Sequence, residues 1–328
     1  VTDVVTLTDT NLTALNFFAD LDTDDDNTVA NRATATAAAR AADPTWTGIG
    51  STVAGDTAYK ATINDESTVA NFNGVTLANN TATALTVNIN ASLDDVIYGA
   101  TAYNLGQLTA HGVTSMAIVV SNEDVTAGSG TNALTTINNI YAKNMSTLTI
   151  EAKEDVTLNT VSGAALNNSL TTLDASKVGG ELKATVISLG DGAQVTLANG
   201  DNVFSALGSA GKGIKINAGT GNNNITGSAQ SDTITTSSGN DTIAGDRGDN
   251  VITSGAGDDI LSAKDGNDIY DVGTGINTVT DNVGTSINGV LATNTVSAGF
   301  GATSVQIASA GVAATTDQYL AVGNGSQL

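Results

Sequence analysis

Apolar and polar residues alternate along the middle of the chain, from about residue 84 to residue 197. The runs at 85–89, 116–120 and 148–150 are short and rich in Thr, Val and Ile. A period of two residues with β-branched side chains is typical of strands that bury one face. This stretch therefore predicts a series of short β-strands.

Several of these strands contain the same motif, an apolar residue, a polar residue and then Ala, at residues 89–91, 150–152, 173–175 and 216–218. The steps between them are 61, 23 and 43 residues, and the strand around Val119 divides the first step roughly in half. Spacings of about 20 to 30 residues fit one rung of a β-solenoid. An antiparallel sandwich of short strands is the alternative. We favour the solenoid because the pattern runs in phase into a regular repeat.

That repeat occupies residues 218–280, which divide into seven nonamers without an insertion: AGTGNNNIT, GSAQSDTIT, TSSGNDTIA, GDRGDNVIT, SGAGDDILS, AKDGNDIYD and VGTGINTVT. The fourth position is Gly in six of the seven and Gln230 in the second nonamer. The eighth position is a large apolar residue throughout. The sixth position is always Asp or Asn, namely Asn223, Asp232, Asp241, Asn250, Asp259, Asp268 and Asn277.

Each position of the nonamer has a physical role. Glycine permits a turn with φ > 0 that packs closely against the next turn, and the eighth residue fills a thin core. Two nonamers complete one turn of a roll, so turns 18 residues apart stack about 4.8 Å from each other. Acids stacked this closely repel, and calcium between them removes the repulsion with backbone carbonyls as further ligands. We therefore expect folding to be coupled to calcium binding.

The predicted calcium ligands are the seven residues at position six, with Asp249 and Asp258 at position five as further candidates. Alternate turns stack, so the repeats form five gaps in two ladders. Only the gap between Asp241 and Asp259 has a carboxylate on both sides, because every other gap pairs one Asp with one Asn. Calcium affinity rises with the number of anionic ligands, so this gap is expected to bind calcium most tightly.

The nonamers resemble the glycine- and aspartate-rich repeats of the RTX family, whose members are secreted by Gram-negative bacteria through type I export. The likeness covers about a fifth of the chain, and the leading Gly pair of the family is degenerate here. Residues 170–176, followed by Gly179 and Gly180, look like strand repeats of RTX-type surface-layer (S-layer) proteins. That resemblance implies a calcium-dependent lattice on the outer cell surface.

Composition narrows the classes of function. The chain has 328 residues, 36 Gly, one Pro and no Cys, so disulfides and thiolate metal sites are excluded. A formal net charge of -22 makes nucleic acid a poor partner, and no apolar run is long enough to span a membrane. The chain begins at Val1, without Met or a signal segment, so a fragment or a processed product is expected.

An acidic cluster, Asp20–Asp26, precedes an Ala-rich run at residues 28–42. The cluster resembles the start of a calcium loop but has Asp25 where that loop needs Gly. The preferred interpretation is a short helix over the Ala-rich run, capped by Asp26 or Asn27 and ended by Pro44. A metal site at the cluster is the alternative.

Enzyme activity has little support in the sequence. His111 is the only His, and the chain contains no G-x-S-x-G, zinc-protease or nucleotide-binding motif. His111 is interpreted as a surface residue at the end of a helix. A pair of carboxylates on a β-solenoid could serve a glycosidase, but adjacent acids such as Asp94 and Asp95 face opposite sides of a strand. We therefore expect no catalytic site.

The predicted fold is all-β: a right-handed parallel β-solenoid, or β-helix, that ends in a calcium β-roll, with a short N-terminal helix. The fold is predicted to have four segments: a mixed region at 1–83, a solenoid with loose rungs at 84–217, the calcium roll at 218–280 and a C-terminal β cap at 281–328. The predicted function is a structural cell-surface protein that self-assembles into a calcium-dependent lattice, with cell-surface polysaccharide as a further candidate partner. The alternatives are a calcium-stiffened adhesin or biofilm-matrix protein, and the non-catalytic part of a secreted enzyme.

Overall fold

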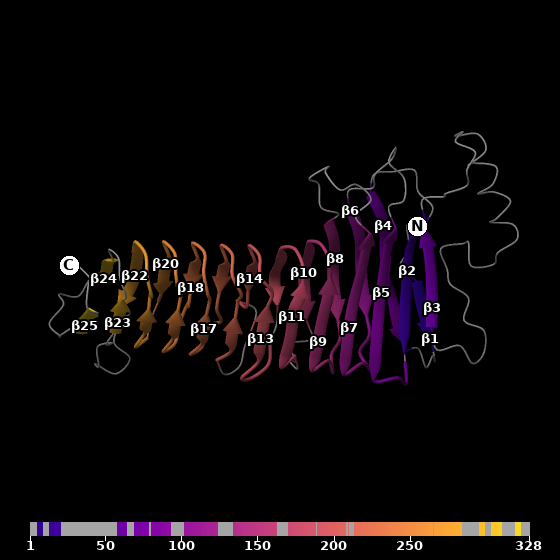
Figure 1. Cartoon of the computed structure of the whole chain (residues 1–328). Helices are drawn as coiled ribbons and strands as arrows, with labels where there is room; N and C mark the ends of the chain where they lie inside the picture. The colour runs from indigo at the N-terminus through magenta and orange to yellow at the C-terminus, as the bar shows by residue number, and fades with distance from the viewer. Residues whose placement is uncertain are drawn as a thin grey trace, which may run out of the picture. The chain divides into compact units, whose positions relative to one another are not determined.

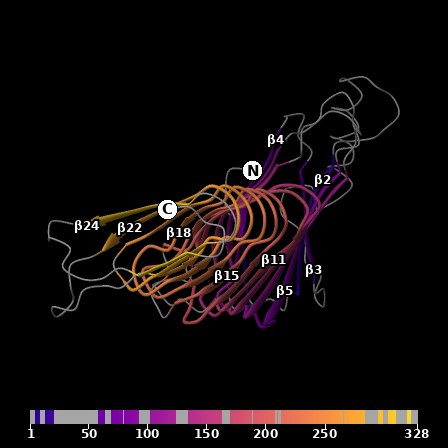
Figure 2. The same ribbon diagram turned by 60° about the vertical axis from the view of Figure 1, so that its left-hand side comes forward.

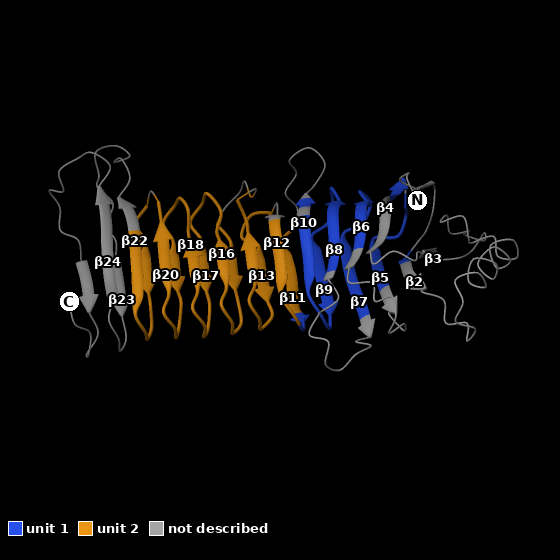
Figure 3. Cartoon of the chain, turned by 90° about the horizontal axis from the view of Figure 1, so that it is seen from above, with its two compact units in different colours: residues 1–167, 177–179 blue, residues 168–176, 180–328 orange. Residues whose placement is uncertain are grey.

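The computed structural model describes residues 5–8, 13–20, 58–63, 69–78, 80–92, 102–123, 134–162, 170–187, 189–207, 209, 213–264, 266–283, 295–298, 303–309 and 319–322. These residues form strands and turns, and none of them is in a helix. Accordingly, no helix within these ranges could cross a membrane. The chain divides into two compact units, residues 1–167 with 177–179, and residues 168–176 with 180–328 (Figure 3).

The first unit contains two sheets that take strands from the chain largely in alternation (Figure 1). One sheet has the order β1 (Val5–Thr8), β4 (Val69–Ala78), β6 (Ala102–Thr109), β8 (Leu134–Tyr141) and β10 (Val156–Ser162). The other has the order β3 (Ala58–Ile63), β2 (Ala14–Asp20), β5 (Ala84–Ser92), β7 (Ser115–Glu123) and β9 (Thr147–Ala152). The strand pairs within this unit are parallel.

The second unit has the same plan with shorter strands. One sheet runs β12 (Leu182–Ile187), β14 (Val203–Ser205), β16 (Asn224–Thr226), β18 (Thr242–Ala244), β20 (Ile260–Ala263), β22 (Asn277–Val283) and β24 (Thr303–Ser309). The other runs β11 (Thr172–Val178), β13 (Gln194–Leu197), β15 (Lys215–Asn217), β17 (Thr233–Thr235), β19 (Val251–Thr253), β21 (Ile269–Asp271), β23 (Thr295–Ala298) and β25 (Tyr319–Val322). Pairing is again parallel.

The parallel pairing confirms the solenoid and shows that the antiparallel sandwich was wrong. Paired positions of β7 and β9 are 32 residues apart, those of β13 and β15 are 21 apart, and those of β18 and β20 are 18 apart. The step widens again to 26 residues between β21 and β23. The shortest rungs are therefore those made of two nonamers, whose turns lie one behind another in Figure 2.

The interior consists of inward-facing aliphatic side chains, as the alternation predicts. Unit 1 buries Leu85, Met116 and Leu148 at paired positions of neighbouring strands. In the roll the middle residue of each three-residue strand is the buried one, because the period of two puts its neighbours outside. All seven residues at position eight are completely buried, namely Ile225, Ile234, Ile243, Ile252, Leu261, Tyr270 and Val279.

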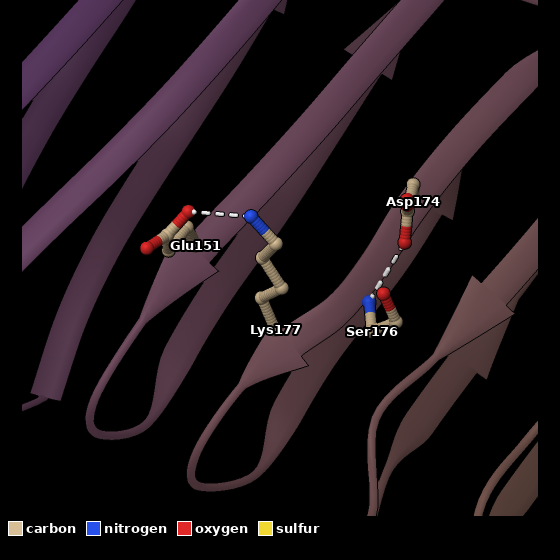
Figure 4. A network of polar contacts seen from close by, with 4 residues as sticks. All are labelled: Glu151, Asp174, Ser176 and Lys177. Atoms are coloured by element: carbon tan, nitrogen blue, oxygen red, sulfur yellow. Dashed lines mark hydrogen bonds and ion pairs between the residues drawn. The ribbon is translucent and has the colours of Figure 1, made fainter.

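The outer faces carry polar contacts. In unit 1 Asn138 Nδ2 donates to Asn104 Oδ1 at 3.1 Å, and Asn159 Nδ2 donates to Asn138 Oδ1 at 2.7 Å, which forms a ladder across β6, β8 and β10. Lys177 pairs with Glu151 at 3.1 Å (Figure 4). Both side chains of that pair are exposed, so it contributes at most about 1 kcal/mol to stability.

The predictions for His111 and for the N-terminal helix have different outcomes. His111 is exposed as predicted, but it lies in a turn between β6 and β7 and not at the end of a helix. Its Nδ1 accepts a hydrogen bond from the Lys143 N–H at 3.4 Å. The expected helix at residues 28–42 lies outside the described residues, as does the acidic cluster beyond Asp20.

Candidate metal centre

The six-residue turns of the roll depend on glycine at position four. Gly257 has φ of 144°, and a Cβ there would lie 2.0 Å from the carbonyl oxygen of Gly239, one turn earlier. Gly239 and Gly275 have the same conformation and the same close contact with the preceding turn. Any side chain at these positions would collide with backbone, so the repeated glycine sets how closely the turns stack.

The side chains at position six are almost completely buried, with exposed fractions of 1% or less, and they form two ladders. We call the ladder of Asn223, Asp241, Asp259 and Asn277 the first edge. The ladder of Asp232, Asn250 and Asp268 is the second edge. The structure thus groups these predicted site residues as the nonamer register requires.

Along each edge, Oδ1 of a position-six residue accepts the backbone N–H of the position-six residue 18 residues earlier. On the first edge these bonds run from Asn223 N–H to Asp241, then from Asp241 N–H to Asp259, and from Asp259 N–H to Asn277, at 2.8, 2.9 and 2.9 Å. On the second edge the Asp232 and Asn250 N–H groups donate in the same way at 3.0 and 2.8 Å. One oxygen of each side chain is therefore used to connect consecutive turns.

On the first edge, the second carboxylate oxygen, Oδ2, does not connect consecutive turns. Oδ2 of Asp241 and Oδ2 of Asp259 are buried and have no hydrogen-bond donor. The Ser254 hydroxyl donates to the Val272 carbonyl at 3.1 Å, and it also interacts with Asp259, whose pKa it lowers. Burial raises the pKa of Asp259, and the neighbouring carboxylates of Asp241 and Asp258 raise it further against hydrogen bonds that lower it.

The two acids of the second edge differ. Asp268 accepts the Asn250 N–H through Oδ1, but its Oδ2 is buried without a hydrogen bond, as on the first edge. Asp232, in contrast, has an internal donor set. The Ser228 N–H donates to Oδ2 at 2.6 Å, and the Ser228 hydroxyl lies 2.8 and 3.0 Å from the two oxygens. The Ile214 N–H donates to Oδ1 at 2.9 Å. Burial still raises the pKa of Asp232, although these hydrogen bonds from Ile214 and Ser228 lower it in part.

The position-five residues form a separate, exposed ladder. Its side-chain hydrogen bonds run in the opposite direction along the chain from those of position six. The side-chain oxygen of Asp258 accepts the Ile276 N–H at 2.8 Å, and that of Asp249 accepts the Asn267 N–H at 2.8 Å. Each acceptor therefore serves the turn 18 residues later. The structure thus places Asp249 and Asp258, both predicted as additional ligands, on the solvent side of the turns.

The residues of the first edge fit a hard divalent cation. Buried carboxylate oxygens without donors, beside backbone carbonyls of a tight turn, are the oxygen ligands that calcium takes. The described residues contain no group of three or more His, Asp or Glu side chains that could hold a metal ion. A cation at Asp241 and Asp259 therefore needs carbonyl oxygens to complete its coordination.

Three contributors to the site were not identified from the sequence. Asn202 continues the first edge before the nonamers begin, because its Nδ2 donates to Asn223 Oδ1 at 2.9 Å. Its place two residues before the buried Phe204, like that of Asn223 before Ile225, was a usable signal. The Ser228 hydroxyl and the ion pair between Lys264 and Asp246 on neighbouring turns had no comparable signal.

Comparison with known families identifies the repeat. The model for the RTX calcium-binding nonapeptide repeat, in four copies, matches residues 217–252 and again residues 245–279. Repeats of this type bind calcium, and proteins that carry them are typically secreted by Gram-negative bacteria. Neither the curated proteins nor the solved structures gave a match. The family match therefore covers the roll.

Proposed function

We propose that this chain is a secreted structural protein of a Gram-negative cell surface, exported by a type I system, that assembles into a calcium-dependent lattice of the S-layer kind. The RTX repeats support calcium binding and secretion. Copies of the same chain are the proposed principal partner, with cell-surface polysaccharide as the proposed anchor. No catalytic role is proposed.

The observation that carries the proposal is the architecture shared by both units. Rung after rung presents short parallel strands, a core of small aliphatic side chains and a surface of Thr, Asn and Ser. Within the described residues, the buried acids occur at position six of the roll, where they belong to the turns rather than to a substrate cleft. Such a body is suited to stiffness and repetition, which a lattice subunit requires.

The terminal strands support self-association. β1 and β3 are the outer strands of the two sheets in unit 1, and β24 and β25 are the outer strands in unit 2. An outer strand has one edge with unpaired N–H and C=O groups, which can pair with a strand of another molecule. We therefore propose that copies associate through these edges once calcium has reduced the repulsion of a chain with net charge -22.

Electron microscopy of the purified protein tests the proposal directly. Samples in calcium and in chelator are compared at equal ionic strength, so that charge screening alone is controlled. We expect ordered sheets in calcium, dispersal into monomers in chelator, and recovery when calcium is restored. Assembly that is indifferent to chelator would contradict the proposal. Protein that stays monomeric in calcium but binds a glycan-coated surface would favour the adhesin instead.

A further inference from the structure

The turns of the first edge differ in one atom, and that difference separates two kinds of turn. At Asn223 and at Asn277, as at Asp241 and Asp259, Oδ1 lies at the N–H of the preceding turn. The second atom is an amide nitrogen in the asparagine turns and a carboxylate oxygen in the aspartate turns. Because an N–H group can face only the oxygen of an amide, these hydrogen bonds also fix which atom is Nδ2.

In the asparagine turns, Nδ2 donates back into the turn that carries it. Asn223 Nδ2 lies 3.3 Å from the Gly219 carbonyl and 2.9 Å from the Gly221 carbonyl, and it also lies 3.0 Å from Asp241 Oδ1 in the next turn. Asn202 makes the same pair of contacts, to the carbonyls of Ala198 and Gly200, at 3.0 and 2.9 Å. The amide thus provides a positively polarised group between two carbonyl oxygens of its own turn.

The remaining asparagines follow the same rule. Asn277 Nδ2 lies 3.1 Å from the Val272 carbonyl and 3.5 Å from the Gly275 carbonyl. On the second edge, Asn250 Nδ2 lies 3.0 Å from the Gly248 carbonyl. A carbonyl of position four receives the amide proton in each of these turns, so the contact is a property of the turn and not of one rung.

The aspartate turns have an oxygen where the asparagine turns have this donor. Oδ2 of Asp241 and Oδ2 of Asp259 are buried and have no donor, and an ionised carboxylate oxygen has no proton to donate to a carbonyl. A buried oxygen without a partner is costly, and a cation that binds both it and the carbonyls removes that cost. The amide nitrogen and the cation thus perform the same task in different turns.

We propose that the asparagine turns hold their shape without metal, and that on the first edge calcium is required only where Asp241 and Asp259 lie. On the second edge the Ser228 hydroxyl gives Asp232 the donor that its carboxylate needs. The first edge therefore has a calcium-dependent centre between metal-free turns, with Asn202 and Asn223 on one side and Asn277 on the other. On the second edge, Oδ2 of Asp268 is a buried oxygen of the same kind as those of Asp241 and Asp259, so calcium is expected there too. The inference rests on the calcium coupling in the proposed function and specifies the turns that provide it.

The test uses the full chain, with calcium alone as the ligand, and follows amide hydrogen exchange by mass spectrometry. In the double variant Asp241→Asn with Asp259→Asn, exchange in β18 and β20 should be slow in chelator, within about twofold of the parent in calcium. Its calcium stoichiometry should fall. In the parent, removal of calcium should speed exchange in these strands by about tenfold or more.

The reverse change is Asn223→Asp, which should make a metal-free turn calcium-dependent. In chelator, exchange in β16 should become at least about tenfold faster than in the parent. The matched control is Asn222→Asp, which adds the same charge one residue earlier on the exposed ladder. It should leave the calcium requirement unchanged.

The outcomes separate the two proposals. If the parent roll is equally protected in calcium and in chelator, the calcium coupling of the proposed function fails and this inference fails with it. If the parent depends on calcium but the double asparagine variant is unprotected in both conditions, calcium coupling stands and the inference is overturned. Equal effects of Asn222→Asp and Asn223→Asp would also overturn it, because net charge alone would then explain the result.

Discussion

The residue at position six of the nonamer connects the backbones of consecutive turns, and this role does not depend on metal binding. Its Oδ1 accepts an N–H from the preceding turn whether the residue is Asp or Asn, as at Asp259 and Asn277. This shared role explains why both residue types occur there without disturbing the register. The difference between them lies in the second side-chain atom, which is satisfied internally in Asn and by Ser228 in the case of Asp232.

Replacement of Ser228 by Ala should therefore destabilise the second edge. The variant leaves the buried Asp232 carboxylate with backbone donors alone, and loss of a hydrogen bond to a charged group costs about 1 to 3 kcal/mol. We expect unfolding at lower denaturant concentration in chelator. The matched control is Ser237→Ala, at the same nonamer position but exposed. Similar losses in both variants would refute the role assigned to Ser228.

The turn and its strand act as one element, and glycine determines how closely two such elements stack. Residues at positions one to six turn the chain, and positions seven to nine form a strand of three residues. Strands this short have few ladder hydrogen bonds, so the contact between consecutive turns matters more than in the longer rungs of unit 1. Gly257 is one such case, because a Cβ there would lie 2.0 Å from the Gly239 carbonyl oxygen.

The Gly257→Ala variant should lose about 3 kcal/mol or more, since φ of 144° is unfavourable for Ala and its Cβ would lie 2.0 Å from a backbone oxygen. Gly192→Ala is the control for backbone conformation alone. That residue has φ of 65° but no atom within 4 Å of a Cβ, so a loss of about 1 kcal/mol is expected. Thermal unfolding in calcium measures both. Equal losses would show that close approach between turns is unimportant.

In the molecule as a whole, the two units differ in the charge of their described buried polar residues. Among the described residues, the buried acids Asp232, Asp241, Asp259 and Asp268 all belong to the second unit. The buried polar residues of the first unit are Asn80, Thr109 and Thr135, which are uncharged. Among the residues that the structure describes, repulsion between buried acids is therefore confined to the roll.

Removal of calcium should accordingly loosen one unit and spare the other. In chelator, hydrogen exchange in β18 and β20 should accelerate by about tenfold or more, whereas β7 and β9 should remain protected within about twofold. Sodium chloride at matched ionic strength serves as the control for screening. Uniform loss of protection in both units would contradict local calcium dependence and would indicate cooperative unfolding of the whole chain.

The sequence was sufficient for the fold of the roll and for the membership of its two ladders. A period of nine residues, read with a period of two in each strand, assigns Ile243 to the core and Asp241 to the turn without further information. The same alternation predicted the longer rungs around Leu85 and Leu148. Parallel pairing was favoured because the strand spacing runs in phase into the nonamer repeat, and the observed registers confirm it.

Only the folded chain shows which side-chain atoms already have partners. The donors to Asp241 and Asp259 come from turns 18 residues away, and their number depends on which atom of a side chain faces which carbonyl. Counting Asp and Asn along the chain gives the charge of each gap, but it does not show which side-chain oxygens accept a hydrogen bond. The presence or absence of that hydrogen bond separates the asparagine turns, which complete their own hydrogen bonds, from the aspartate turns at Asp241, Asp259 and Asp268, which leave a buried oxygen for a cation.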